Sequence, residues 1–411
     1  MIRRRRPRER RRKHQPSRQS ALPLPPPAPD ALDACTCSLA EACGGCALIG
    51  SSYAAQLAYK RQVLEEILAS EPILARVPVA PTLPSGEPAA YRHRAKLAVA
   101  SEDGRVKIGL FQRGSHRIVD IVRCAVHRPL LDEATAVLRR WLAGHRLAVP
   151  RGPIKYVDLR EAEGRTLYLG LVLECTAEEA GDLPLDDLLD RLPLAGIRLN
   201  FNPQRSSYVF GEVNRILHGT GEIEIRVDPA APPLLVPSGG FLQLNLSVLP
   251  ALHALMRDHL GDTGPLHDLY CGSGLHGLTL LGEGRELVGI EADAAAVAAA
   301  RRNATRRGLG PYCRFIAGPV EELYPPLRRV QAARRVVLNP SRPGCRGPVL
   351  DALIAEPAHR LAYLSCNPHT LVRDLARLAQ GGYGILEVVP VDMMPQTDQV
   401  EALALCAHRG K

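Results

Sequence analysis

The sequence predicts an α/β protein made of two folded parts. After about residue 240, short apolar stretches alternate with helical patterns, which is typical of a parallel sheet wound on both faces. Before that point, apolar and polar residues alternate with a period of two, which is typical of half-buried antiparallel strands. We therefore expect a basic arm and linker over 1–34, a β-rich central domain over 35–240 and an α/β domain over 241–411.

The positive charge of the chain is concentrated in its first residues. Residues 1–18 hold ten Lys or Arg and one Glu, a net charge of +9, and the rest of the chain holds 42 basic and 42 acidic residues. Such an arm is expected to be disordered and to bind nucleic-acid phosphates without reading sequence. The other interpretation is an upstream extension or a solubilising tail. Residues 19–34 are rich in Pro and Ala and are interpreted as a semi-rigid linker.

The compartment bears on how the eleven cysteines are interpreted. No run of about 18 apolar residues could span a membrane, and no apolar stretch follows the N-terminal arginines as in a secretory signal. We therefore expect a cytoplasmic protein without membrane contact. Cytoplasmic thiols stay reduced, so the cysteines point to metal binding or catalysis before disulfides.

Three cysteines are spaced as a compact ligand clip. Cys37, Cys43 and Cys46 are separated by five and two residues, and a Gly-Gly pair lets the backbone wrap closely. Cys124, after an alternating stretch over 118–122, is the predicted fourth ligand, because Cys35 would crowd its neighbour. Thiolates suit zinc as well as iron–sulfur, and the alternative is a set of unrelated free thiols.

The elements expected before residue 240 are one helix and several strands. An amphipathic helix is expected over 51–69, and we expect it to pack on the α/β domain. Period-two alternation predicts strands at 94–99, 167–173 and 223–227.

The α/β domain is expected to begin its sheet near residue 265. Strands are predicted at 265–270, 287–290, 335–338 and 361–365, with an Ala-rich helix over 294–306. Residues 383–392 and 400–407 are joined by a short loop and should form an antiparallel pair.

Four polar or reactive residues fall where these strands stop. They are Tyr270, Glu291, Asn339 and Cys366. Ligands of such sheets bind outside the carboxyl ends of the strands, so these residues should gather at one edge. Cys366 is followed by Asn-Pro, which forces a turn, and Thr370 is expected to cap the next helix. A cysteine on a stiff turn suits a nucleophile, although a cysteine beside a strand is more often structural.

The first of these strands leads into a glycine-rich turn. Gly272, Gly274 and Gly277 form a G-x-G-x-x-G between a strand and a helix, and Glu291 ends the next strand, where it could bind both ribose hydroxyls of a cofactor. The pattern fits a dinucleotide as well as any other nucleoside-bearing cofactor. The alternative is glycines needed only for a tight turn.

Five motifs together resemble the bacterial 5-methyluridine RNA methyltransferases, in particular the iron–sulfur-containing type that acts on 23S ribosomal RNA. The resemblance covers residues 35–411. It is carried by the cysteine clip, Phe241-Leu-Gln243-Leu-Asn245, Asp268-Leu-Tyr270-Cys-Gly272-Ser-Gly274, Ser365-Cys366-Asn367-Pro368-x-Thr370-Leu371-x-Arg373-Asp374, and Pro395-Gln-Thr-x-x-Val-Glu401.

The resemblance implies a Rossmann-like class I methyltransferase domain with a reversed last strand. It implies transfer of a methyl group from S-adenosyl-L-methionine to C5 of a uridine through a Cys366–C6 adduct, with Glu401 removing the C5 proton. The implied cofactor-binding residues are Gln243, Tyr270, Gly272, Gly274, Glu291 and Asn339. The implied ligands of a [4Fe-4S] cluster, with zinc as the alternative metal, are Cys37, Cys43, Cys46 and Cys124. The implied partner is RNA, with ribosomal RNA favoured over transfer RNA, and we expect a monomer.

The chain departs from the family pattern at three positions. Asn339 stands where an aspartate is expected near the uracil edge, Pro319 where a polar residue approaches the adenine, and Gln399 where a histidine is common. The asparagine amide can read uracil in one orientation and cytosine in the other. The departures leave open 5-methylation of cytidine, or an RNA-binding homologue that has lost turnover. A nicotinamide oxidoreductase would leave Cys366 and Glu401 unexplained.

The resemblance would also imply an N-terminal β-barrel module that binds RNA, but we expect the segment over 1–34, ahead of the clip, to be too short for a closed barrel. We expect the basic arm to replace part of its contribution.

Overall fold

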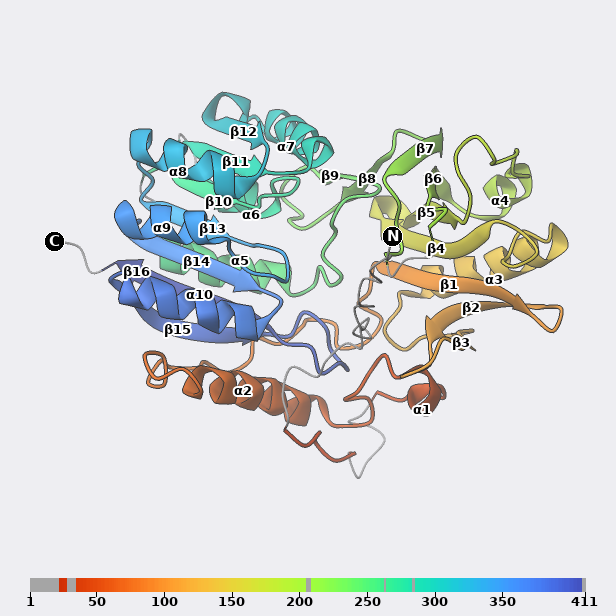
Figure 1. Cartoon of the computed structure of the whole chain (residues 1–411), viewed down its shortest axis with the longest axis horizontal. Coiled ribbons are helices and arrows are strands. Elements are labelled where there is room, and N and C mark those ends of the chain that lie inside the picture. The colour runs from red at the N-terminus through yellow and green to blue at the C-terminus, as the bar shows by residue number, and fades with distance from the viewer. Residues whose placement is uncertain (1–21, 28–34, 205–207, 262–263, 283–284, 409–411) are drawn as a thin grey trace, which may run out of the picture.

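The structure is a computed structural model that describes residues 22–27, 35–204, 208–261, 264–282 and 285–408. Two seven-stranded sheets lie side by side, one in the C-terminal half and one in the central part of the chain (Figure 1). The basic arm over 1–18 and most of the linker lie outside the described residues. Within the described residues, no helix is long and apolar enough to cross a membrane.

The C-terminal sheet has the strand order β12-β11-β10-β13-β14-β16-β15. Its strands are Leu266–Leu269 (β10), Leu287–Glu291 (β11), Cys313–Ala317 (β12), Arg335–Leu338 (β13), Arg360–Ser365 (β14), Tyr383–Val391 (β15) and Glu401–His408 (β16). The five strands β10 to β14 are parallel, and β16 runs antiparallel to both β14 and β15. The predicted α/β class with a reversed last strand is thereby confirmed.

Helices cover both faces of this sheet, because its strands carry apolar side chains on both faces. One face is covered by Leu249–Leu260 (α5), Leu275–Leu280 (α6) and Ala294–Arg306 (α7). The other is covered by Val320–Val330 (α8), Gly347–Ala355 (α9), Pro368–Gln380 (α10) and Tyr53–Ala69 (α2). A short 3₁₀ helix, Gly310–Tyr312 (η3), precedes β12.

Helix α2 belongs to the core of the C-terminal sheet, although the whole central part of the chain separates it from β10. Its buried face, which includes Val63, Leu64 and Ile67, packs in the same apolar cluster as residues of α10 and β15. Figure 1 shows the helix below β15 and α10. The N-terminal segment is therefore a structural part of the α/β domain.

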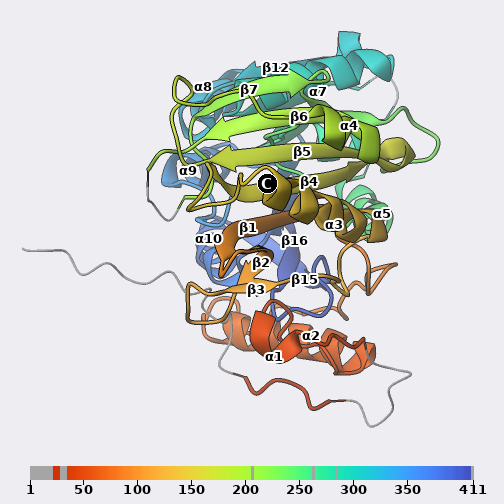
Figure 2. The same ribbon diagram turned by 90° about the vertical axis from the view of Figure 1, so that its right-hand side faces the viewer.

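The central sheet has the order β3-β2-β1-β4-β5-β6-β7, and Figure 2 shows these strands one above another. They are Arg94–Glu102 (β1), Arg105–Phe111 (β2), Ile118–Asp120 (β3), Ile154–Ala162 (β4), Thr166–Leu173 (β5), Leu194–Phe201 (β6) and Val213–His218 (β7). Neighbours pair antiparallel except β5 and β6, which pair in parallel. Pro129–Gly144 (α3) and Asp186–Arg191 (α4) pack on one face, and Glu163–Arg165 (η2) joins β4 to β5.

The predicted strand at 223–227 has a different role from its neighbours in the chain. It forms Glu222–Ile225 (β8), which pairs with Leu234–Pro237 (β9) in a separate two-stranded sheet. Ile223 and Leu234 pack in the same apolar cluster as α5 to α7. This ribbon therefore connects the central sheet to the α/β domain.

Candidate active site

The carboxyl ends of four neighbouring parallel strands meet at one edge of the C-terminal sheet. Tyr270 follows β10, Glu291 ends β11, Asn339 follows β13 and Cys366 follows β14. These strands are adjacent in the order β11-β10-β13-β14. The sheet topology thus places the four residues predicted from the strand ends on a common edge.

The glycine turn after β10 is built from left-handed backbone. Tyr270, Gly272 and Gly274 have φ of 63°, 53° and 85°, a region that a tyrosine adopts only under constraint. The Glu291 carboxylate stabilises the turn by accepting hydrogen bonds from the backbone N–H groups of Gly272 at 3.1 Å and of Asp293 at 2.9 Å. The acid predicted to bind ribose is therefore held at the glycine turn itself.

Two buried polar groups from the family motifs lack full hydrogen bonding among the described residues. Asp268 accepts from the Gly277 N–H at 2.8 Å through Oδ2, whereas its Oδ1 has no partner. Burial raises the pKa of Asp268 to about 7. The Gln243 side chain is also buried, and its Nε2 has no partner. Buried unpaired polar atoms are costly, so a polar ligand that pairs with them would be favoured.

Cys366 lies half-buried on the turn between β14 and α10. Burial and the neighbouring Glu401 carboxylate raise the pKa of its thiol, and the Arg342 guanidinium, which hydrogen-bonds the sulfur, opposes that rise. Arg342 was not among the predicted site residues, although it ends the segment Asn339-Pro-Ser-Arg342, because its contact with the thiol depends on the fold.

The helix cap after Cys366 differs from the predicted one. Asn367 is the N-cap of α10 and accepts from the His369 N–H at 3.2 Å. Thr370 instead donates through Oγ1 to the carbonyl of Arg342 at 3.1 Å. The expectation of a Thr370 cap was therefore wrong, because the hydroxyl joins the turn after Cys366 to the loop that follows β13.

Glu401 faces Cys366 across an antiparallel strand pair. Ser365 of β14 pairs with Ala402 of β16, so the next positions, Cys366 and Glu401, stand opposite each other. Glu401 is buried, and burial raises its pKa to about 7. A carboxylate with that pKa suits proton transfer at neutral pH.

Asn339 is joined to two buried histidines that the sequence did not single out. Its Nδ2 lies 3.2 Å from Nε2 of His276, on α6, and Nδ1 of His276 lies 3.0 Å from Nε2 of His253, on α5. In the sequence both histidines occupy apolar stretches of helices, where a core residue is the ordinary interpretation. Only the folded structure brings His276 into contact with Asn339 and His253 into contact with His276.

The other two departures from the family pattern lie close to the same edge. Pro319 is the N-cap of α8, directly after β12, and offers no N–H. Gln399 is half-buried, and its backbone N–H donates to Thr397 Oγ1 at 3.3 Å, shortly before Glu401 in the chain.

The cysteines predicted as metal ligands come from two segments, near α1 (Ala40–Cys43) and after β3. Cys37 and Cys124 line one cavity of 710 Å³, and burial together with the Cys124 thiolate raises the pKa of Cys46 to about 12. However, no three His, Cys, Asp or Glu side chains in the described part of the chain form a group that could hold a metal ion. The side chains as placed, Cys43 included, do not support the predicted metal site.

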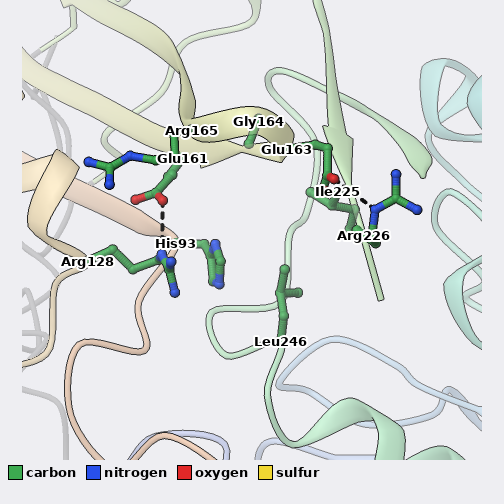
Figure 3. Close-up of a pocket in the computed structure, with 10 residues that line it drawn as sticks. His93, Arg128, Glu161, Glu163, Gly164, Arg165, Ile225, Arg226 and Leu246 are labelled. Carbon is green, nitrogen blue, oxygen red and sulfur yellow. Dashed lines mark hydrogen bonds and ion pairs between the residues drawn. The ribbon is translucent and has the colours of Figure 1, made fainter. Parts of the chain in front are cut away.

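A separate basic pocket of 240 Å³ lies where the central sheet meets the segment before α5. Figure 3 shows its charged lining, in which Arg128 donates to Glu161 at 3.0 Å and Arg226 to Glu163 at 2.8 Å. None of the predicted site residues lines it. The guanidinium groups of Arg128 and Arg226 are already paired with carboxylates, so the pocket does not resemble a catalytic centre.

Known proteins similar to this chain are RNA methyltransferases. An uncharacterized RNA methyltransferase of Thermosynechococcus vestitus is 33% identical over 386 residues, which cover 90% of this chain and 83% of that protein. One from Halalkalibacterium halodurans is 30% identical over 387 residues, with 91% and 83% covered. No model of a protein family matches the chain.

Among solved structures, the tRNA (uracil-54, C5)-methyltransferase of Pyrococcus abyssi, in complex with S-adenosyl-L-homocysteine, superposes with a TM-score of 0.71. It is 26% identical and covers 87% of this chain and 84% of its own. The likeness therefore extends over both sheets rather than over the C-terminal sheet alone.

Proposed function

Because this chain belongs to a family of RNA methyltransferases, we propose that it methylates C5 of a uridine in structured RNA, with S-adenosyl-L-methionine as methyl donor. The observation that carries the proposal is the pairing of β14 with β16, which sets a cysteine opposite a buried glutamate at the ligand-binding edge of the sheet. The structural likeness to a uracil-C5 methyltransferase supports the same reaction.

The reaction needs a nucleophile because C5 of uracil is a weak one. The Cys366 thiolate adds to C6, and the electron pair of the C5–C6 double bond moves into an enolate that makes C5 carbanion-like. S-adenosyl-L-methionine supplies an electrophilic methyl group, which C5 takes. Glu401 then removes the proton from C5, the double bond re-forms and the thiolate leaves C6. The products are 5-methyluridine, S-adenosyl-L-homocysteine and a proton.

The cofactor residues proposed from the sequence fit the edge at which they lie. Gly272 and Gly274 form the turn after β10, and the Glu291 carboxylate is hydrogen-bonded to it. Glycines let the backbone approach a nucleoside closely, and an acid can bind its ribose hydroxyls. Gln243 offers an unpaired buried amide, and Tyr270 and Asn339 follow adjacent strands. We propose that these six residues hold the cofactor.

The target uridine must leave its helix to reach Cys366. Thiolate attack on C6 requires access to the face of the ring, which stacking covers, so the base is flipped or already unstacked. The sequence favoured ribosomal RNA because of the cysteine clip. The side-chain geometry does not support that clip as a metal site, so ribosomal and transfer RNA are equal candidates in the tests below.

A [4Fe-4S] cluster on Cys37, Cys43, Cys46 and Cys124 remains a separate hypothesis. The two cysteine segments approach each other, since Cys37 and Cys124 line one cavity, but the described side chains do not form a group that could hold a metal ion. An anaerobic preparation with bound iron and the visible absorbance typical of iron–sulfur charge transfer would support it. Colourless protein with stoichiometric zinc would favour zinc, and protein without either metal would reject both.

The proposed activity is tested by mapping 5-methylpyrimidines in total RNA from cells with and without the gene. We expect one or a few 5-methyluridines to disappear in the deletion strain and to return with the wild-type protein but not with Cys366→Ala. The matched control is Cys175→Ala, which changes a partly exposed thiol remote in sequence from the site. Unchanged RNA would reject the proposal.

A second candidate is an RNA-binding homologue without turnover, which Asn339 and Pro319 favour because each replaces a polar contact of the family pattern. It predicts binding of RNA and of the cofactor with no methyl transfer. The mapping experiment separates the two.

A further inference from the structure

The pair His253 and His276 has no role in the chemistry described above. Both imidazoles are buried in the core between α5, α6 and the sheet, with 2% and 3% of their surface exposed. Burial lowers the pKa of His276 to about 4 and that of His253 well below its ordinary value, so both rings are neutral. Two neutral histidines in an apolar core cost more free energy than two leucines unless their ring nitrogens are hydrogen-bonded, and Nδ1 of His253 has no partner among the described residues.

The atoms in contact set the direction of both hydrogen bonds between these side chains. An amide nitrogen only donates, so Nε2 of His276, 3.2 Å from the Asn339 Nδ2, must accept. A neutral imidazole that accepts at Nε2 carries its proton on Nδ1, so His276 donates to Nε2 of His253 at 3.0 Å. With the Asn339 amide placed in this way, the hydrogen bonds run from Asn339 through His276 to His253, whose proton then lies on Nδ1, an atom without a partner among the described residues.

This direction leaves a defined edge of Asn339 available for a ligand. One N–H of its amide is used by His276, so the carbonyl oxygen and the other N–H are left for a ligand. That edge accepts one hydrogen bond and donates one. It is complementary to uracil, which donates from N3–H and accepts at O4.

Cytosine presents the opposite pattern at the same two positions. It accepts at N3 and donates from its 4-amino group, so it would require the Asn339 amide to turn over. The turned amide would set its oxygen against the lone pair of His276 Nε2, which is repulsive unless both histidines shift their protons.

We propose that His276, supported by His253, is a positioning residue that selects uracil over cytosine by fixing the orientation of the Asn339 amide. This inference rests on the proposed C5 methylation. It also bears on the departure at position 339, because an aspartate there would require His276 to donate from Nε2, which reverses the direction of both hydrogen bonds. On this inference asparagine and His276 form a matched pair, so the departure at position 339 does not require a loss of activity.

The test compares matched RNA stem-loops that carry uridine or cytidine at the nucleotide mapped above. His276→Phe keeps a buried ring but removes the acceptor. We expect kcat/KM for uridine to fall about 10-fold, in line with one misaligned bidentate base contact, and the uridine-to-cytidine ratio to fall with it. Affinity for S-adenosyl-L-homocysteine, measured by calorimetry, should fall less than the uridine-to-cytidine ratio, since Asn339 is only one of the six residues proposed to hold the cofactor. Thr279→Ala on the same helix, where the hydroxyl donates to the Leu275 carbonyl at 2.7 Å, is the control and should leave the ratio unchanged.

A double-mutant cycle separates positioning from a merely structural effect. In an Asn339→Ala background, His276→Phe should cause no further loss, because the residue through which it acts is gone. Additive losses, or equal losses on both bases with weaker cofactor binding, would overturn the inference while leaving the proposed function standing. If the wild-type protein methylates neither base at C5, the proposed function fails and this inference fails with it.

Discussion

At the scale of single residues, the environment of Cys366 and Glu401 sets when the proposed reaction can start. Burial and the Glu401 carboxylate both oppose ionisation of the thiol, while the Arg342 guanidinium and a backbone hydrogen bond favour it. Burial also raises the pKa of Glu401 to about 7, so this side chain keeps its proton below neutral pH. The pair therefore needs Arg342 and a pH at or above neutral to reach its reactive form.

The pH dependence follows from the direction of these shifts. Glu401 acts as a base only when deprotonated, and Cys366 attacks only as a thiolate. Both groups have raised pKa values, that of Glu401 at about 7, so the rate of methyl transfer should rise with pH through neutrality and continue to rise above it. Single-turnover rates with labelled cofactor from mildly acidic to mildly alkaline pH test this, and a rate that falls across neutrality would contradict the assignment.

Replacing Glu401 should separate methyl transfer from release. In Glu401→Gln the thiolate still adds and C5 still takes the methyl group, but nothing removes the C5 proton. Turnover should fall about 100-fold or more, and a covalent protein–RNA complex should accumulate on ordinary uridine RNA. Denaturing gels measure the complex, and slow turnover with no trapped complex would place Glu401 outside that step.

Replacing Arg342 should raise the thiol pKa further. In Arg342→Ala, alkylation of Cys366 by iodoacetamide, followed by peptide mass spectrometry, should slow several-fold at mildly alkaline pH, because fewer thiolates form. Arg342→Lys should recover part of the rate, since the charge remains. Exposed Arg346 on the same loop is the control, and equal effects from both positions would show a general charge effect instead of a contact.

At the scale of elements, α2 holds the loop that leads into Glu401. The Lys60 ammonium pairs with Asp392 at 2.5 Å, with both side chains fully buried. Gln56 exchanges two hydrogen bonds with Gln396, whose φ of 69° is strained for a non-glycine residue. The helix thus fixes the turn between β15 and β16 and, through it, the start of β16.

Removing one partner of the buried pair should be strongly destabilising. Lys60→Ala leaves the Asp392 carboxylate buried without its ion partner, which costs about 3–5 kcal/mol of unfolding free energy. Arg61→Ala at the next position removes only an exposed pair with Glu65 and should change stability by less than about 0.5 kcal/mol. Urea unfolding of both variants measures the difference, and similar midpoints would contradict a structural role for Lys60.

The elements also show what the sequence could predict. Long periodic segments such as α7 and the strands β10, β11, β13 and β14 were placed correctly, because apolar runs between turns leave few alternatives. Helix α8 was not anticipated, since Pro325 and Pro326 lie inside it and argue against a helix. The Asn367 cap and the relay behind Asn339 depend on contacts between distant segments, which spacing along the chain does not reveal.

At the scale of the whole molecule, the net charge lies in the arm over 1–18, while the remainder of the chain is balanced. The two sheets therefore offer RNA no overall positive field, and local arginines must position it. The arm can supply the long-range attraction that the balanced part lacks.

Deleting the arm over 1–18 should weaken RNA binding and flatten its dependence on salt. Each phosphate that the arm no longer neutralises removes about 0.9 from the slope of log affinity against log salt for a duplex. A variant of the full arm with Gln in place of each Lys and Arg should behave like the deletion, which separates charge from length. Unchanged binding at low salt would reject a role for the arm.

The central claim is that Cys366 forms a covalent bond to C6 of the target uridine. RNA carrying 5-fluorouridine tests it directly, because fluorine at C5 cannot leave as a proton does and the methylated adduct is trapped. With S-adenosyl-L-methionine present, intact mass spectrometry should show protein plus RNA plus one methyl group for the wild type, and no adduct for Cys366→Ala. Free wild-type protein after incubation under conditions in which it binds both RNA and cofactor, or an adduct that persists in Cys366→Ala, would contradict the account.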